Sequence, residues 1–169
     1  MEKNLTYYFR FLQDFPMQSL IEGCEFPWEL LQRAKELLRG KSNHIGEGTT
    51  IHPGAELSGP VWIGKNCEIG HGALIRPYTV IGDGCAVGHG SEVKHSILMN
   101  GSKVASLAFV GDSVIGKSAR VGSGVITANR KFNQSAVKCA GEDLRSDFFG
   151  VVLGDYSRLG ANSVTQPGT

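Results

Sequence analysis

The chain has 169 residues, and its 17 lysines and arginines balance 16 aspartates and glutamates, which leaves a formal charge of +1 at pH 7. This balance excludes a strongly basic nucleic-acid-binding surface, and no segment approaches the roughly 20 apolar residues of a membrane-spanning helix. Because the first residues also lack the pattern of a signal peptide, we expect a cytoplasmic protein without nucleic-acid or membrane partners.

The cysteines and glycines indicate what kind of domain this is. Four scattered cysteines form no CxxC pair, so they suit neither a disulfide-rich scaffold nor a zinc site. We therefore expect buried free thiols and no metal. The 23 glycines are about twice ordinary usage, yet 41% of the residues are hydrophobic. Glycine at this frequency in a well-packed chain indicates a structure built from many tight turns.

Residues 1–43 are predicted to form a helical cap. Pro27 can begin a helix through PWELLQRAKELLRG, in which leucine and alanine recur at helical spacing, and Gly40 can end it. A second short helical piece is suggested by the apolar residues Phe9, Phe11, Leu12, Phe15 and Leu20. We expect both pieces to cover the open first coil of the domain that follows, because exposed strand edges pair with other chains.

A six-residue repeat organises residues 44–169. Aliphatic residues stand at every sixth position from 45 to 93, the residue four places later is nearly always small, and glycine often follows the aliphatic residue. A period of six does not fit a helix, but it fits short strands joined by turns, with three strands in each 18-residue coil. The sequence therefore predicts an all-β solenoid with Ile45, Ile63, Ile81 and Met99 in one interior column.

The repeat is interrupted twice. It weakens after Met99 and resumes at Phe109 after a four-residue step, so we expect an irregularity near residues 105–109. Residues 128–150 are polar, keep no period, and are predicted to form a loop or arm that leaves the coil. The repeat then returns at Leu153 and continues to the final QPGT, where we expect a neighbouring chain or further residues to cover the last coil.

Two cationic residues, Arg76 and Lys94, occupy positions where the pattern usually has glycine. They are one coil apart and should lie about 5 Å from each other on one corner. Like charges at that distance repel, so a bound anion such as phosphate would relieve the strain. The alternative, which the spacing leaves open, is two solvated side chains that fan apart.

Three histidines recur in the same region: His71, His89 and His95. Gamma-class carbonic anhydrases bind zinc through three histidines, two of them five residues apart after a stretch that resembles IGHGAL. Here the required second position is Arg76, so we interpret the histidines as facing solvent rather than holding a metal. Asp112 follows a glycine and is interpreted as a turn residue.

The repeat pattern resembles that of the hexapeptide-repeat family, which implies a left-handed parallel β-helix. Within residues 63–129, the segments LIRPYTVIG, VGHGSEVKHSILMNGSKVASLAFVGDSVIG and VGSGVITAN resemble a particular acetyltransferase domain. It is the domain of bifunctional N-acetylglucosamine-1-phosphate uridylyltransferase/glucosamine-1-phosphate acetyltransferases and related sugar-phosphate nucleotidylyltransferases. The GxGTRM nucleotide loop of these enzymes is absent, so nucleotidyl transfer is not expected.

The resemblance implies roles for seven residues. The phosphate-binding arginine and lysine of the family fall on Arg76 and Lys94, and an asparagine that contacts the sugar falls on Asn129. The catalytic histidine is replaced by Ser106, its neighbouring tyrosine by Phe109, and a second asparagine by Arg120. A serine that contacts coenzyme A is replaced by Ala161.

These replacements imply binding without efficient catalysis. A serine hydroxyl is a poor base near neutral pH, so we expect the chain to bind an amino-sugar phosphate or nucleotide sugar while acetyl transfer from acetyl-CoA is impaired. His95 or a residue of an adjacent chain could substitute for the base. The resemblance also implies a homotrimer with sites between subunits. Two alternatives stay open: a non-catalytic trimeric scaffold or regulatory module, and an acyltransferase with another acceptor.

Overall fold

The computed structural model describes residues 3–169 and confirms the predicted all-β fold. The chain visits three parallel sheets in turn, as in a left-handed β-helix. Sheet A contains β1 (His44–Ile45), β4 (Trp62–Ile63), β7 (Val80–Ile81), β10 (Ile97–Leu98), β13 (Val114–Ile115) and β18 (Val152–Leu153). Sheet B contains β2 (Thr50–Ile51), β5 (Glu68–Ile69), β8 (Ala86–Val87), β11 (Lys103–Val104), β14 (Arg120–Val121) and β19 (Arg158–Leu159). Sheet C contains β3 (Glu56–Leu57), β6 (Leu74–Ile75), β9 (Glu92–Lys94), β12 (Phe109–Gly111), β15 (Ile126–Thr127) and β20 (Val164–Thr165).

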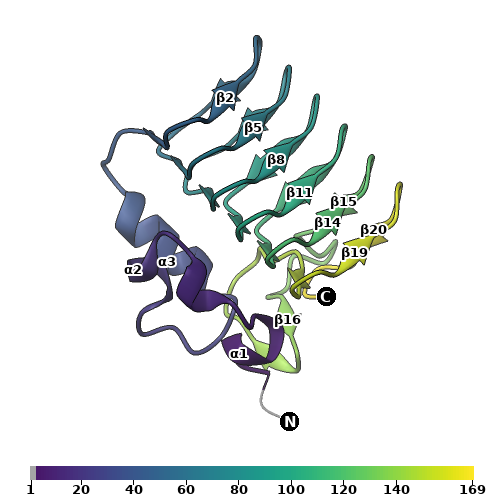
Figure 1. Cartoon of the computed structure of the whole chain (residues 1–169). Helices are drawn as coiled ribbons and strands as arrows, with labels where there is room; N and C mark the ends of the chain where they lie inside the picture. Colours follow the sequence, from purple (N-terminus) through teal and green to yellow (C-terminus); the bar gives the residue numbers. More distant parts are fainter. Residues whose placement is uncertain (1–2) are drawn as a thin grey trace.

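The strands stack as successive coils (Figure 1). The solenoid interior is filled by the second residue of most strands, and these aliphatic side chains are almost completely buried. Successive coils place the interior residues of each sheet in one column, as the six-residue period predicts. The predicted column Ile45, Ile63, Ile81 and Met99 is wrong at its last member, because Ile81 pairs with Leu98. Met99 instead packs outside the solenoid with the N-terminal segment.

The irregularity lies in two shortened turns rather than near residues 105–109. Trp62 pairs with Val80, 18 residues on, whereas Val80 pairs with Ile97 and Ile97 with Val114, each 17 residues on. One residue is therefore missing between β9 and β10, and another between β12 and β13. In these turns His95 and Asp112 adopt left-handed backbone conformations, with φ of 44° and 46°.

The N-terminal helices cover the side of sheet A, not the open end of the first coil. They are α1 (Leu5–Tyr8), a short 3-10 helix (Leu12–Asp14), α2 (Gln18–Ile21) and α3 (Glu29–Leu38), and Figure 1 shows them beside the stack of strands. The buried stripe of α3 packs in one cluster with the outward residues of sheet A, among them Val80, Ile97 and Val114. Ile45 at the open end remains 46% exposed. The helices lie there because a parallel sheet with two apolar faces needs cover on both.

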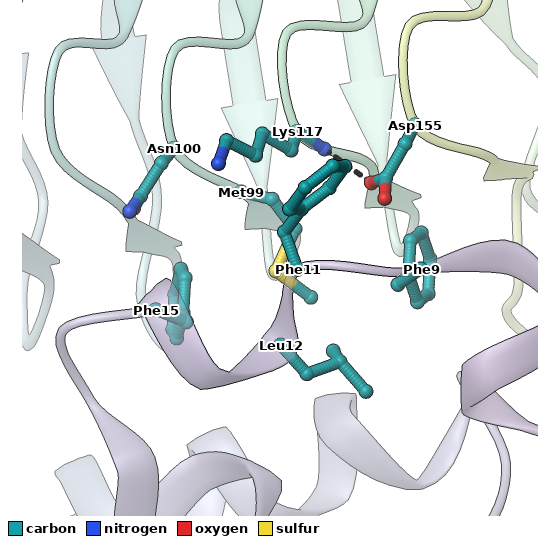
Figure 2. A pocket seen from close by; sticks show the side chains of 8 residues that line it. All are labelled: Phe9, Phe11, Leu12, Phe15, Met99, Asn100, Lys117 and Asp155. Atoms are coloured by element: carbon teal, nitrogen blue, oxygen red, sulfur yellow. Dashed lines mark hydrogen bonds between the residues drawn. The ribbon is translucent and has the colours of Figure 1, made fainter.

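Polar contacts hold the N-terminal segment against the coils (Figure 2). Lys117 donates to the Asp14 carboxylate at 2.8 Å, and its ammonium lies 4.1 Å from the Phe11 ring centroid. Asn100 donates to the Asp14 carbonyl at 2.8 Å, and Asp155 accepts from the backbone N–H of Arg10 at 2.7 Å. Asp155 also accepts from the backbone N–H of Lys117 within the solenoid, the bond dashed in Figure 2. The remaining cavity is about 10 Å³, room for about one water. This region is therefore a packing contact between the N-terminal segment and the coils rather than a ligand site.

The segment 128–150 does not simply project from the coil. It contains an antiparallel hairpin of β16 (Lys138–Cys139) and β17 (Glu142–Asp143). Its residues Val137, Cys139 and Phe149 are buried in the same apolar cluster as α3. The sequence of this segment did not predict these contacts, because it is mostly polar and only a few of its side chains pack in the apolar cluster.

Glycines after the inward residues allow adjacent coils to approach closely. A Cβ on Gly88 would lie 2.6 Å from the backbone nitrogen of Ser106, in the next coil. The four cysteines are free, as predicted, although Cys24 is only half-buried. Within residues 3–169, no helix has the length and hydropathy needed to cross a membrane.

Candidate functional site

Arg76 and Lys94 lie on neighbouring coils at the corner between sheets C and A, because Ile75 pairs with Val93. Each has its own carboxylate: Arg76 donates to Glu92 at 2.8 Å, and Lys94 donates to Asp112 at 2.8 Å. The repulsion from which a bound anion was predicted is therefore relieved within the chain. Most N–H donors of both groups are left over for another partner, since a guanidinium has five and an ammonium three.

Asp112 is the centre of this corner, although its sequence indicated only a turn. Its side chain is 4% exposed and accepts hydrogen bonds from Lys94, from Nδ1 of His95 at 3.1 Å and from Asn129 at 2.5 Å. Burial raises the pKa of Asp112, but the hydrogen bonds from His95, Lys94 and Asn129 outweigh it and hold this pKa below its ordinary value. We call Lys94, His95, Asp112 and Asn129 the Asp112 cluster.

His95 connects this cluster to the N-terminal helices and is unsuited to replace a catalytic base. Its Nδ1 faces the Asp112 carboxylate, and its Nε2 lies 2.9 Å from the carbonyl oxygen of Leu31 in α3. Each ring nitrogen thus already has a partner within the chain. Neither nitrogen is free to accept a proton from a bound ligand. The predicted substitution of His95 for the missing base is therefore not supported by this arrangement.

The segment 128–150 closes over the same corner. Asn129 at its start reaches Asp112, and near its end the Phe148 ring centroid lies 4.4 Å from the Lys94 ammonium. Arg130 approaches the same ring at 5.2 Å. The Phe148 ring thus partly shields Lys94 from solvent, and the electron-rich face of the ring attracts the ammonium.

The second group of predicted residues lies at the corner between sheets B and C. The turn after each strand of sheet B repeats the same position in successive coils, and the residues there are His71, His89, Ser106, Ser123 and Ala161. Backbone bonds connect the stack: Leu107 donates to the His89 carbonyl at 2.9 Å, and Gly124 to the Ser106 carbonyl at 3.0 Å. Ser106, in the predicted base position, therefore lies two coils from Ala161, in the predicted coenzyme position.

His89 has the free ring nitrogen that His95 lacks. Its Nδ1 lies 2.8 Å from the carbonyl oxygen of His71, and because a carbonyl only accepts, Nδ1 must donate. In the neutral ring the proton is then on Nδ1, and Nε2 can accept one. His89 is exposed and lines a groove of about 350 Å³ that also contains Lys103 and Arg120. The sequence predicted only that His89 faces solvent, but its place one coil below Ser106 could have been found from the repeat.

One chain does not bring all seven predicted residues together. Arg76, Lys94 and Asn129 lie at the corner between sheets C and A, whereas Ser106 and Ala161 lie at the corner between B and C. Arg120 projects from the outer face of sheet B, where it pairs with the exposed Lys103. Phe109 projects from the outer face of sheet C, where it pairs with the exposed Ile126.

Residues 3–169 contain no group of three or more His, Cys, Asp or Glu side chains arranged to hold a metal ion.

Comparison with known proteins places these features in a family context. The family described as GMPPB C-terminal domain matches residues 57–166. The bifunctional protein GlmU of Methanocaldococcus jannaschii is 35% identical over 161 residues, covering 84% of this chain and 40% of the relative. GlmU of Prochlorococcus marinus is 32% identical over 161 residues, covering 86% of this chain and 33% of the relative.

A third relative is a bifunctional sugar-1-phosphate nucleotidylyltransferase/acetyltransferase of Sulfurisphaera tokodaii. It is 38% identical over 128 residues, which cover 73% of this chain and 32% of the relative. The chain thus spans between about a third and two fifths of the length of these relatives.

Proposed function

We propose that this chain, which belongs to the GMPPB C-terminal domain family, binds an amino-sugar phosphate or a nucleotide sugar and has impaired acetyl transfer. One observation carries this proposal: the match to a protein named a sugar-1-phosphate nucleotidylyltransferase/acetyltransferase extends over 73% of the chain. The residues at the two corners supply the physical detail.

The phosphate would bind at Arg76 and Lys94 through the donors that Glu92 and Asp112 leave unused. Because each cation is already neutralised, the site attracts an anion less strongly than two free cations would, and the ligand must share donors with the carboxylates. Asn129 supplies an amide beside them for a sugar hydroxyl. Phe109 and Arg120 would contact the sugar from the outer faces of sheets C and B.

Acetyl-CoA is the acetyl donor in this proposal. Its contact position, Ala161, is an exposed corner residue without a hydrogen-bonding side chain, so only backbone groups there could hold the coenzyme. Ser106 cannot take a proton from an attacking amine near neutral pH. His89, one coil below, is the chain's best available base. Acetyl transfer is therefore expected to be slow.

The ligand test is calorimetric titration with glucosamine-1-phosphate and with UDP-N-acetylglucosamine. We expect wild-type binding at millimolar concentration, weakened about tenfold or more in the double variant Arg76→Ala/Lys94→Ala, since two charge-assisted contacts are lost. The control Arg39→Ala/Lys41→Ala removes two exposed charges elsewhere and should bind normally. Absent wild-type binding, or equal binding by both variants, would contradict the proposal.

We also propose a homotrimer, because the outer face of sheet C carries an apolar column. Phe109 pairs with Ile126, and Ile126 with Val164, and the last two are 46% and 64% exposed. Burying this column between copies would remove apolar surface from water. It would also let the corner of Arg76 in one copy approach the corner of Ser106 in another.

The assembly prediction is tested by light scattering. Wild type is expected to be trimeric at micromolar concentration, and Ile126→Lys is expected to be largely monomeric because a charge is buried without a partner. Thr50→Lys, on the exposed face of sheet B, serves as the matched control and should remain trimeric. A monomeric wild type would overturn the assembly, whatever its ligand.

The second candidate is a non-catalytic trimeric scaffold or regulatory module. The internal ion pairs of Arg76 and Lys94 favour it, because a chain that neutralises its own cations needs no ligand there. A trimer that binds neither sugar ligand would support this function. An acyltransferase with another acceptor would instead consume acetyl-CoA in a screen of amines and alcohols.

A further inference from the structure

Three cations form a column on the outer face of sheet B. Lys103 pairs with Arg120, and Arg120 with Arg158, through strands β11, β14 and β19. All three side chains are exposed, and neighbouring strands lie about 4.8 Å apart. The column therefore presents three positive charges on consecutive coils, two of them guanidinium groups.

No carboxylate within residues 3–169 forms an ion pair with these three cations, and none of their side chains makes a hydrogen bond there. This distinguishes them from Arg76, Lys94 and Lys117, each of which has its own carboxylate. The chain neutralises Arg76 and Lys94 at the corner between sheets C and A but leaves the column on sheet B without a counter-charge. Stacked like charges repel, so an anion on the column is favoured.

A groove lies beside the column, and its base is formed by residues of strand β8 and the turn that follows. Ala86 is the small residue of the outward column, one coil below Lys103, and Val87 and Gly88 continue the base. Glu68 lies one coil further down, where it contacts His52 at 3.0 Å rather than Lys103. The groove holds about 350 Å³. It is therefore cationic at one end and has a carboxylate acceptor at the other.

We propose that Lys103 and Arg120, which line this sheet B groove, and Arg158 on the next coil beyond it bind the diphosphate group of an organic diphosphate ester. A single phosphate can reach two neighbouring coils, whereas a diphosphate has enough oxygens, spread over enough length, to contact three. The arginine fork also matches phosphate oxygens in a two-point contact. The organic part lies over Ala86, where Glu68 can accept hydrogen bonds from hydroxyl groups.

Nucleotide sugars and coenzyme A both carry a diphosphate ester, so the two sources share the chemistry that the column recognises. The proposal goes beyond the binding at Arg76 and Lys94 and does not depend on acetyl transfer, because its residues belong to another sheet and have no part in the Asp112 cluster. Arg120 is the one residue that it shares with the proposed sugar contacts, whereas Lys103 and Arg158 have no role there.

The experiment is calorimetric titration of the full chain with inorganic pyrophosphate at low ionic strength, followed by UDP and ADP. We expect wild type to bind pyrophosphate and Arg120→Gln/Arg158→Gln to bind it about tenfold more weakly. Lys41→Gln/Lys65→Gln removes two exposed charges that form no ion pair within residues 3–169 and should leave binding unchanged. Stronger binding of UDP than of ADP assigns the site to a nucleotide sugar, and the reverse assigns it to coenzyme A.

A second variant tests the column by adding a charge. Ala86→Glu places a carboxylate beside Lys103 at a half-buried position on the outer face of sheet B, and it should abolish pyrophosphate binding, whereas Ala86→Gln should weaken it far less. The proposal is overturned if wild type does not bind pyrophosphate at millimolar concentration, as when a second copy covers the groove, or if the charge controls weaken binding equally. Because Arg76 and Lys94 are themselves proposed to bind a phosphate, the titration is repeated in the Arg76→Ala/Lys94→Ala background. Pyrophosphate should still bind there, and adding Arg120→Gln/Arg158→Gln should weaken that binding about tenfold, which separates this proposal from the sugar site.

Discussion

Replacing Asp112 by asparagine is expected to lower the free energy of unfolding by about 2 to 3 kcal/mol, because it leaves a partly buried cation without its charged partner. The Asp112 carboxylate accepts from Lys94, His95 and Asn129 and is almost completely buried. Asparagine keeps the size of the side chain and tolerates the left-handed backbone, so the loss reports the charge. Asparagine also has one acceptor oxygen in place of two, so it cannot accept from Lys94, His95 and Asn129 together.

The measurement is urea denaturation followed by circular dichroism, with Asp147→Asn as the control. Asp147 is exposed and its side chain makes no hydrogen bond within residues 3–169, so its replacement should change stability by less than about 0.5 kcal/mol. Equal stability of wild type and Asp112→Asn would show that Asp112 does not hold this corner together.

Acid provides a second test of the same carboxylate. The pKa of Asp112 is lowered in the folded chain, so its contribution to stability is present above the unfolded value of about 3.9 and is lost as the pH falls through the folded value. The stability difference between wild type and Asp112→Asn should therefore be constant near neutral pH and shrink in acid. A difference that grows on acidification would contradict the sign.

The coil architecture follows from the sequence because each sixth residue must fill the same narrow interior. The two shortened turns do not, since Leu98 and Met99 are both apolar and either could face inward. Only the pairing of Ile81 with Leu98 decides between them. One missing residue shifts every later column, which explains the misplaced irregularity.

The sequence also placed Arg76 over Lys94 correctly but missed their partners. Glu92 and Asp112 come from the next coil, 16 and 18 residues away, a spacing at which acidic residues could have been sought. The position of the helices was predictable too, because the outward residues of sheet A are apolar and need cover. What spacing could not reveal is the contact of His95 with Leu31, 64 residues away.

Replacing Ser106 by histidine is expected to raise the rate of acetyl transfer to glucosamine-1-phosphate by at least about hundredfold, since a placed general base commonly contributes 10²- to 10⁴-fold. Ser106 is half-buried in a corner turn, and its hydroxyl makes no hydrogen bond within residues 3–169. The substitution therefore breaks no contact. An imidazole there would stand one coil above His89, beside the groove.

The assay follows free thiol released from acetyl-CoA, with Ser123→His as the matched control. Ser123 is the equivalent corner residue one coil further on, so its replacement adds the same imidazole a coil away and should leave the rate unchanged. If Ser106→His gains nothing, a missing base is not the reason for low activity, and the scaffold function becomes the better account.

Adding His89→Gln to both backgrounds separates the two candidate bases. If His89 takes the proton in the wild-type chain, His89→Gln should abolish the residual transfer, while the double variant with Ser106→His should keep most of the gained activity. Equal losses of rate in both backgrounds would mean that His89 contributes to ligand binding in the groove rather than acting as the base.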